Sequence, residues 1–182
     1  VNLLKECNAG VQMGVSAIDE VLPRVESKKL ETLLNDYKNK HSQLGNETNG
    51  LLQELGEEPK EPNPVAKGMS WIKTHMKLGM NHSDKAVADL MTDGCNMGVK
   101  SLNKYLNQYE AADENSKDIA KRLIKLEEKL AIDIRDYIKN EYGDKYLPKS
   151  AKVYKTKKTA QDAHEAIRAT NVNLTPQELK SQ

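Results

Sequence analysis

Two long stretches of the chain place apolar or semi-apolar residues alternately four and three positions apart. In the first stretch these positions are Leu30, Leu34, Tyr37, His41, Leu44, Thr48, Leu51 and Leu55. In the second they are Ile119, Leu123, Leu126, Leu130, Asp133 and Tyr137. Residues three and four apart share one face of an α-helix, so each set predicts a long helix with one buried face.

Short polar and small residues mark where these two helices begin and end. Ser27 and Ser116 precede the apolar positions and are predicted N-caps, because a serine oxygen accepts a hydrogen bond from a free backbone N–H. Gly56 predicts the end of the first helix, since glycine adopts the left-handed turn that follows many helices. The prolines that come next cannot continue a helix: Pro59, Pro62 and Pro64.

A short internal repeat relates residues 10–18 to residues 94–102, at an offset of 84 positions. Both copies contain the pattern Gly-x-x-Met-Gly-Val, in which the two glycines are four residues apart. Glycines at this spacing lie on one helix face, where the missing Cβ lets a neighbouring backbone approach closely. We therefore predict helix crossings at Gly10, Gly14, Gly94 and Gly98.

The order of predicted elements is helix, turn, long helix, Pro-rich loop, a short helix around residues 69–80, and a second helix pair. Aromatic residues make up only 4% of the chain and charged residues 30%, which is typical of long amphipathic helices and disfavours an all-β fold. Two αα-hairpins joined by one long connection predict an all-α fold, namely an antiparallel ferritin-like four-helix bundle with a short crossover helix. A small irregular or helical appendage is expected at the C-terminal end.

Three motifs support this architecture by resemblance. They are the Gly-x-x-Met-Gly-Val repeat, Gly68-Met-Ser-Trp71 and Asp93-Gly-Cys-Asn-Met-Gly-Val. With them, residues 2–137 resemble an uncharacterised bacterial ferritin-like family classed as a domain of unknown function. The resemblance implies the bundle fold for residues 1–137 and implies little about activity, because the motifs are structural rather than chemical.

The ligands of a ferritin-like di-metal centre are missing from the predicted helices. Such a centre needs a Glu from each of two helices and Glu-x-x-His from each of the other two. Lys38 stands three residues before His41, and Leu130 follows three residues after Glu127, so neither helix carries the motif. We predict no metal and no cofactor. His41 is interpreted as a histidine at a helix interface, with Asp133 as its candidate partner.

The remaining soft and basic side chains are interpreted as structural. Methionines at helical spacing are more often core filling than metal ligands, and this applies to Met13, Met76, Met80, Met91 and Met97. His75 and His82 are two helical turns apart and are expected at the surface. Cys7 and Cys95 fit no zinc motif and are expected to be buried free thiols.

Overall charge and hydropathy argue for a cytoplasmic protein without membrane contact. The chain has 28 Lys or Arg residues, 27 Asp or Glu residues and a sequence pI of about 7.8. It contains no run of 18 apolar residues and no basic start before an apolar stretch, which disfavours a membrane span and a signal peptide. The near-neutral balance gives no reason to expect a nucleic-acid partner for the chain as a whole.

The composition changes after Tyr137. Residues 138–182 contain nine Lys or Arg and five Asp or Glu, a net charge of +4, whereas residues 1–137 contain 19 and 22, a net charge of −3. Three of the seven tyrosines also fall in this last part: Tyr142, Tyr146 and Tyr154. We therefore place a module boundary between residues 137 and 138.

The motifs of residues 138–182 resemble another family. Glu141-Tyr-Gly-Asp-Lys-Tyr-Leu-Pro148, Val153-Tyr-Lys-Thr-Lys-Lys158 and His164-Glu-Ala-Ile-Arg168 resemble the segment that follows the catalytic tyrosine region in bacterial type IA DNA topoisomerases. The resemblance implies that His164 and Arg168 contact DNA and assist cleavage. Ala169 stands where that family usually has proline, which loosens the turn after this stretch.

Elementary chemistry agrees with a role for this segment in binding phosphate. His164 and Arg168 are four residues apart, so on a helix they share one face and can address one backbone phosphate. Nearby positive charges add attraction for DNA that does not depend on base sequence: Lys155, Lys157 and Lys158. Catalysis is not expected, because the family's nucleophile context, Tyr-x-Arg-Thr-Asp, and its acidic metal-binding domain are absent from the 182 residues.

Three interpretations of function follow, of which one, a metal-storage or oxidase bundle, is permitted by the ferritin-like fold but disfavoured by the missing ligands. The first is a non-enzymatic helical bundle protein of unspecified cellular role, with self-association through its helices, joined within residues 134–141 to a topoisomerase fragment. The alternative is a DNA-binding fragment of a type IA topoisomerase, inactive alone and binding DNA weakly through its tail. The fragment is expected to be incomplete, since the helix that starts at Thr175 and Pro176 has few residues left.

Overall fold

The computed structural model describes residues 1–59, 83–143 and 146. This part of the chain holds four long helices: α1 (Asn2–Val21), α2 (Lys28–Glu54), α4 (Asp84–Gln108) and α5 (Glu114–Tyr142). A 3-10 turn, η1 (Leu22–Arg24), separates α1 from α2, and the described residues include no strand. The all-α prediction is confirmed for the described residues.

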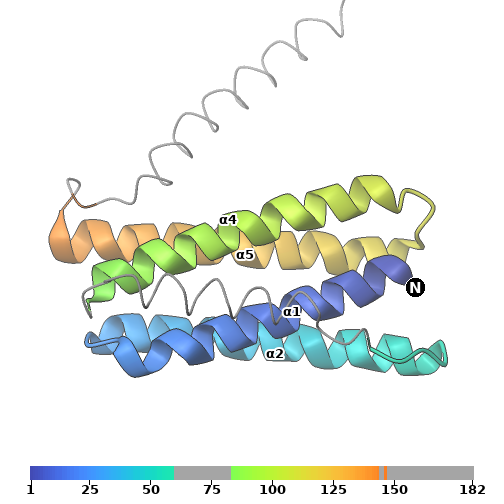
Figure 1. Cartoon of the computed structure of the whole chain (residues 1–182), viewed down its shortest axis with the longest axis horizontal. Coiled ribbons are helices and arrows are strands. Elements are labelled where there is room, and N and C mark those ends of the chain that lie inside the picture. The colour runs from blue at the N-terminus through green and yellow to red at the C-terminus, as the bar shows by residue number, and fades with distance from the viewer. Residues whose placement is uncertain (60–82, 144–145, 147–182) are drawn as a thin grey trace, which may run out of the picture. The chain divides into compact units, whose positions relative to one another are not determined.

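The helices pack as two pairs. α2 folds back along α1, and α5 folds back along α4, as the colour gradient in Figure 1 shows. We call α1 with α2 the first hairpin and α4 with α5 the second hairpin. The two hairpins contact each other through α2 with α5 and through α1 with both helices of the second hairpin.

Local chemistry explains most of the helix ends. The Ser27 side chain accepts a hydrogen bond from the Leu30 backbone N–H, and Gly56 has φ of 67°, so both predicted signals are confirmed. The prediction of Ser116 as an N-cap is wrong, because Asp113 caps α5 instead. The Asp113 carboxylate accepts from both the backbone N–H and the hydroxyl of Ser116. Asp is as good an N-cap as Ser and begins the helix one turn earlier.

The interior contains two hydrophobic clusters, one toward each end of the helices. The first includes Ile18, Leu34, Leu90 and Ile134, and the second includes Leu4, Val11, Leu102 and Leu123. Every helix of the described part contributes to the first cluster and to the second. Burying these aliphatic side chains is the main term that stabilises the packing.

The buried faces follow the predicted spacing with two local shifts. On α2 the predicted positions are buried from Leu30 to Thr48, but Leu52 is buried at the end of the helix whereas Leu55 is 54% exposed. On α5, Glu127 and Ile134 are buried at positions where Leu126 and Asp133 were predicted. An α-helix has 3.6 residues per turn, so a strict four-three alternation drifts from the buried face over several turns.

One carboxylate fastens the start of α4 to the start of α2. Asp84 is 4% exposed, and its two oxygens accept from the backbone N–H groups of Glu26 and Ser27 at 2.9 and 3.0 Å. These N–H groups belong to the turn before α2, where no helical carbonyl is available to them. The contact links the first hairpin to the second.

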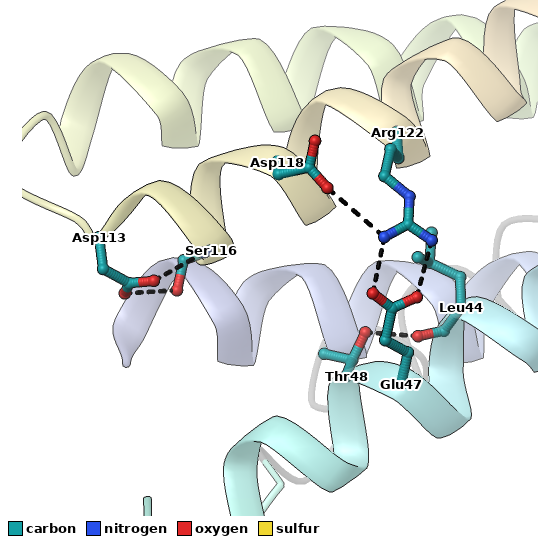
Figure 2. A network of polar contacts seen from close by, with 7 residues as sticks. All are labelled: Leu44, Glu47, Thr48, Asp113, Ser116, Asp118 and Arg122. Atoms are coloured by element: carbon teal, nitrogen blue, oxygen red, sulfur yellow. Dashed lines mark hydrogen bonds and ion pairs between the residues drawn. The ribbon is translucent and has the colours of Figure 1, made fainter.

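An exposed ion pair joins the same two hairpins on the surface (Figure 2). Both terminal nitrogens of Arg122 donate to the Glu47 carboxylate, at 2.6 and 2.7 Å, and Arg122 also lies 3.4 Å from Asp118. Arg122 and Glu47 are nearly half exposed, so solvent screens the pair and its contribution to stability is small.

The chain divides into two compact units, Val1–Leu147 and Pro148–Gln182. α5 continues past Tyr137 to Tyr142, so the predicted boundary at residues 137 and 138 lies inside a helix whose Tyr137 and Ile138 are buried. The short helix predicted around residues 69–80 lies outside the described residues. The appendage predicted for residues 138–182 also lies outside the described residues, except for residues 138–143, which belong to the end of α5 and its cap, and residue 146.

Candidate functional site

A buried polar pair lies where the two hairpins meet. His41 of α2 is 0% exposed and Glu127 of α5 is 8% exposed. His41 Nε2 lies 3.0 Å from Glu127 Oε1, and His41 Nδ1 lies 2.8 Å from the carbonyl oxygen of Tyr37, one turn earlier in α2. Both ring nitrogens therefore have a hydrogen-bond partner inside the packed helices.

The hydrogen-bond partners of His41 determine where its ring protons lie. The Tyr37 carbonyl can only accept, so His41 Nδ1 carries a hydrogen. A second ring proton, on Nε2, makes His41 an imidazolium that donates to Glu127 Oε1. Burial lowers the pKa of His41, but the hydrogen bond and charge of Glu127 together with the Tyr37 carbonyl raise it, and the pKa ends above its ordinary 6.5.

Cys95 of α4 completes this group of side chains. Its thiol is buried and hydrogen-bonds to Glu127. Burial is the largest cause that raises the pKa of Cys95 well above 9.0, and the negative charge and hydrogen bond of Glu127 raise it further. Cys95 is therefore a neutral thiol that donates to Glu127. We call His41, Glu127 and Cys95 the central polar cluster.

The predicted pairing of His41 with Asp133 is wrong. The Tyr37 hydroxyl donates to Asp133 Oδ2 at 2.6 Å, and the Lys129 ammonium donates to the other oxygen. Asp133 is six residues after Glu127, about 9 Å further along α5, which puts it level with Tyr37 rather than with His41. Burial and the Asp133 hydrogen bond raise the pKa of Tyr37 above its ordinary value.

Glu127 is the member of the cluster that sequence reasoning missed. It lies four residues after Leu123 and three before Leu130, and both leucines are buried. This spacing is the same signal that identified the buried leucines. The absence of a Glu-x-x-His motif says nothing about the partner that Glu127 has on the facing helix, which is His41.

Glycines of the internal repeat lie against this pair. A Cβ added at Gly14 would be 2.7 Å from His41 Cδ2, so the ring occupies the space that a side chain on α1 would need. A Cβ at Gly98 would be 3.5 Å from Glu127 Cδ. The second glycine of each repeat copy thus faces one member of the pair.

The first glycine of each copy behaves differently. A Cβ at Gly10 would meet Leu123 Cδ2 at 3.4 Å, whereas nothing lies within 4 Å at Gly94. The contacts at these glycines come from side chains of the opposite helices rather than from a backbone. Close backbone crossing at the four positions remains a prediction.

The other singled-out side chains divide between core and surface. Met91 is buried as expected, but Met97 is 45% exposed, so the core interpretation fails for it. Cys7 and Cys95 are both free and buried, in different hydrophobic clusters. Within the described residues, no group of three or more His, Cys, Asp or Glu side chains is placed to hold a metal ion.

The predicted DNA contacts cannot be placed in this geometry. His164, Arg168 and the lysines at 155, 157 and 158 lie outside the described residues, as do Met76, Met80, His75 and His82. In the part of the chain that the structure describes, no helix is long and apolar enough to span a membrane.

Comparison with known proteins finds similarity over one segment. A 49-residue segment, 26% of this chain, is 59% identical to DNA topoisomerase 1 of Rickettsia bellii. DNA topoisomerase 1 of Pseudomonas aeruginosa is 54% identical over 46 residues, and that of Escherichia coli is 47% identical over 47 residues. The prediction of a topoisomerase-like segment is confirmed at this level.

The similarity covers a small part of each relative. The chain spans 6% of the length of the Rickettsia protein and 5% of the length of the Pseudomonas and Escherichia proteins. No protein-family profile matches the chain, so the resemblance to a ferritin-like family has no support from this source. No solved structure matches it either.

Proposed function

We propose that the chain combines a non-enzymatic helical bundle with a DNA-binding segment related to bacterial topoisomerases. The observation that carries the proposal is the 49-residue segment that is 59% identical to the Rickettsia bellii enzyme. We assign this segment to approximately residues 137–182, where the topoisomerase-like motifs occur. The activity of a whole topoisomerase is not part of the proposal, because the chain spans so little of the relatives' length.

The DNA contact that we propose is made with the phosphate backbone. A guanidinium and an imidazole four residues apart, at Arg168 and His164, suit one phosphate if that stretch is helical. The lysines at 155, 157 and 158 would add binding energy that is largely independent of base sequence. Binding is expected to be weak, since few phosphates are engaged.

DNA binding by the full chain tests this proposal. Affinity for a labelled oligonucleotide is measured against salt concentration for the wild type and for a variant with Lys155, Lys157 and Lys158 replaced by alanine. Each phosphate-contacting lysine contributes about one unit to the slope of log affinity against log salt, so the slope should become shallower by up to about three units. His164→Ala with Arg168→Ala should weaken binding further.

A matched control variant loses the same amount of positive charge from the helices instead of from the tail. Lys100, Lys104 and Lys125 are exposed on α4 and α5, and replacing all three by alanine removes the same net charge. This variant should bind as the wild type does. Equal loss of affinity in both triple variants would show that only net charge matters and would refute a DNA-binding tail.

For residues 1–137 we propose a ferritin-like antiparallel bundle without a di-metal centre. The support is the element order, in which two hairpins are separated by the long connection between α2 and α4, together with the hydrogen-bonded and packed His41 and Glu127 side chains. Adding iron(II) to the full chain in air should give no saturable oxo-iron absorbance. Saturation at two iron ions per chain would contradict this part of the proposal.

Self-association and a cytoplasmic location complete the proposal. Long amphipathic helices commonly associate through exposed apolar side chains, and Met97 and Leu55 are exposed in the described part. Light scattering of the full chain over a range of concentrations measures self-association, and cell fractionation measures the location.

A further inference from the structure

The central polar cluster interrupts the hydrophobic interior. Tyr37 and Leu130 belong to the first hydrophobic cluster, and Leu44 and Leu123 belong to the second. His41 lies in sequence between Tyr37 and Leu44, and Glu127 lies between Leu123 and Leu130. The pair therefore occupies the level at which one apolar cluster ends and the other begins, and each hairpin supplies one of the two side chains.

The pair needs its shared proton. With that proton present, a hydrogen bond joins Nε2 of His41 to Oε1 of Glu127 at 3.0 Å. Without it, the lone pair of Nε2 faces a carboxylate inside the packed helices. Burying an ionised carboxylate that has lost its charged partner is costly, because water no longer solvates it.

The groups that face His41 from the packed helices do not replace this proton. α1 contributes Gly14, which has no side chain, and α2 contributes the Tyr37 carbonyl, which already accepts from Nδ1. α4 contributes Cys95, whose thiol donates to Glu127. On α5, Asp133 accepts hydrogen bonds from the Tyr37 hydroxyl and from the Lys129 ammonium. Among the contacts of the described residues, the cationic partner of Glu127 is His41.

We propose that His41 and Glu127 form a buried proton-dependent switch, in which one shared proton keeps the first hairpin docked on the second. Loss of the proton loosens the contact between α2 and α5, because the two hairpins then bring together a lone pair and a carboxylate. The surface pair of Arg122 with Glu47 and the apolar clusters still hold the hairpins, so the switch weakens their packing without changing the fold.

The pH window follows from the direction of the pKa. In the folded protein the pKa of His41 is raised above its ordinary 6.5. The stabilising contribution is therefore complete below pH 6.5 and is lost as the pH rises through the folded-state pKa. Each unit by which that pKa exceeds 6.5 corresponds to about a tenfold fall in the folding equilibrium constant across the window.

Urea unfolding of the full chain at pH 6 and at pH 9 tests the switch. The wild type should unfold at a lower urea concentration at pH 9. In Glu127→Gln the midpoint should change much less, because an amide can donate to the neutral ring without an extra proton. Glu47→Gln is the matched control, since it removes an exposed carboxylate from an ion pair between the same two helices and should keep the wild-type pH dependence.

The same pH dependence in the wild type and in Glu127→Gln would overturn the proposal. A direct titration decides the matter even where Glu127→Gln does not fold. Imidazole resonances of His41 are followed by NMR in a chain whose other histidines, His75, His82 and His164, are replaced by glutamine. A His41 pKa above 6.5 supports the switch, and a value at or below 6.5 refutes it.

Discussion

The hydroxyl of Tyr137 donates a hydrogen bond to Oδ2 of Asp84 at 2.9 Å, which joins the C-terminal part of α5 to the first turn of α4. The same oxygen accepts from the Ser27 N–H at the start of α2. Three helices thus meet at one buried carboxylate. Tyr137, the last residue of the predicted bundle, is buried in its interior.

Removing that hydroxyl should destabilise the helices. Tyr137→Phe keeps the ring and loses a hydrogen bond to a carboxylate, which costs about 1.5 to 3 kcal/mol in typical cases. Urea unfolding of the full chain measures the change. Tyr109→Phe is the control. The ring centroids of Tyr109 and Tyr105 are 6.4 Å apart in a stacked arrangement, which phenylalanine would keep, and the described contacts include none from the Tyr109 hydroxyl. Equal stability of wild type and Tyr137→Phe would contradict this prediction.

Alanine at Gly14 should be harmful although alanine favours helix. Its Cβ would lie 2.7 Å from the His41 ring, which two hydrogen bonds hold in place, and such overpacking typically costs about 1 to 3 kcal/mol. At Gly50, also inside a helix, nothing lies within 4 Å of an added Cβ. Gly50→Ala should therefore stabilise the protein by about 0.5 to 1 kcal/mol. Thermal unfolding of both variants checks the opposite signs.

Both cysteines should resist alkylation in the folded protein. Burial, with a smaller effect of Glu6, raises the pKa of Cys7 to about 12, so at pH 8 only about one thiol in ten thousand is ionised. The pKa of Cys95 is raised as well. Mass spectrometry after brief iodoacetamide treatment should find neither residue modified until urea is added. Rapid modification of Cys95 without urea would mean that the central polar cluster is open to solvent.

The N-cap of α5 should respond to pH and to mutation. Asp113→Ala removes the acceptor for the Ser116 N–H and should cost about 1 kcal/mol. Hydrogen bonds from Ser116 lower the pKa of Asp113, so the capping contribution is complete above the unfolded-state pKa and is lost as the pH falls through the lower folded value. Unfolding at pH 7 and at pH 3 measures both effects. Asp118→Ala, in the same helix, should cost less than half as much.

Periodicity was enough to predict two of the four long helices of the described part. The spacing of leucines from Leu30 and from Ile119 predicted α2 and α5, and Ser27 and Gly56 marked the ends of α2 correctly. These signals are local, because a helix face and a cap depend on residues within one or two turns. The topoisomerase-like motifs were recognisable for a similar reason, since they lie within one short segment.

The choice of partners depended on the tertiary structure. His41 pairs with Glu127 rather than with Asp133, because the relative register of α2 and α5 determines which residues face each other. The N-cap of α5 is Asp113, three residues before the predicted Ser116, and it accepts a hydrogen bond from the Ser116 N–H. The role of a charged residue on a buried helix face cannot be assigned from the sequence until its partner on another helix is known. The sequence by itself thus determined the helices and most of their apolar faces. Only the packing of the two hairpins decided which polar groups are buried together, because polar pairing depends on the register between helices that are far apart in the chain.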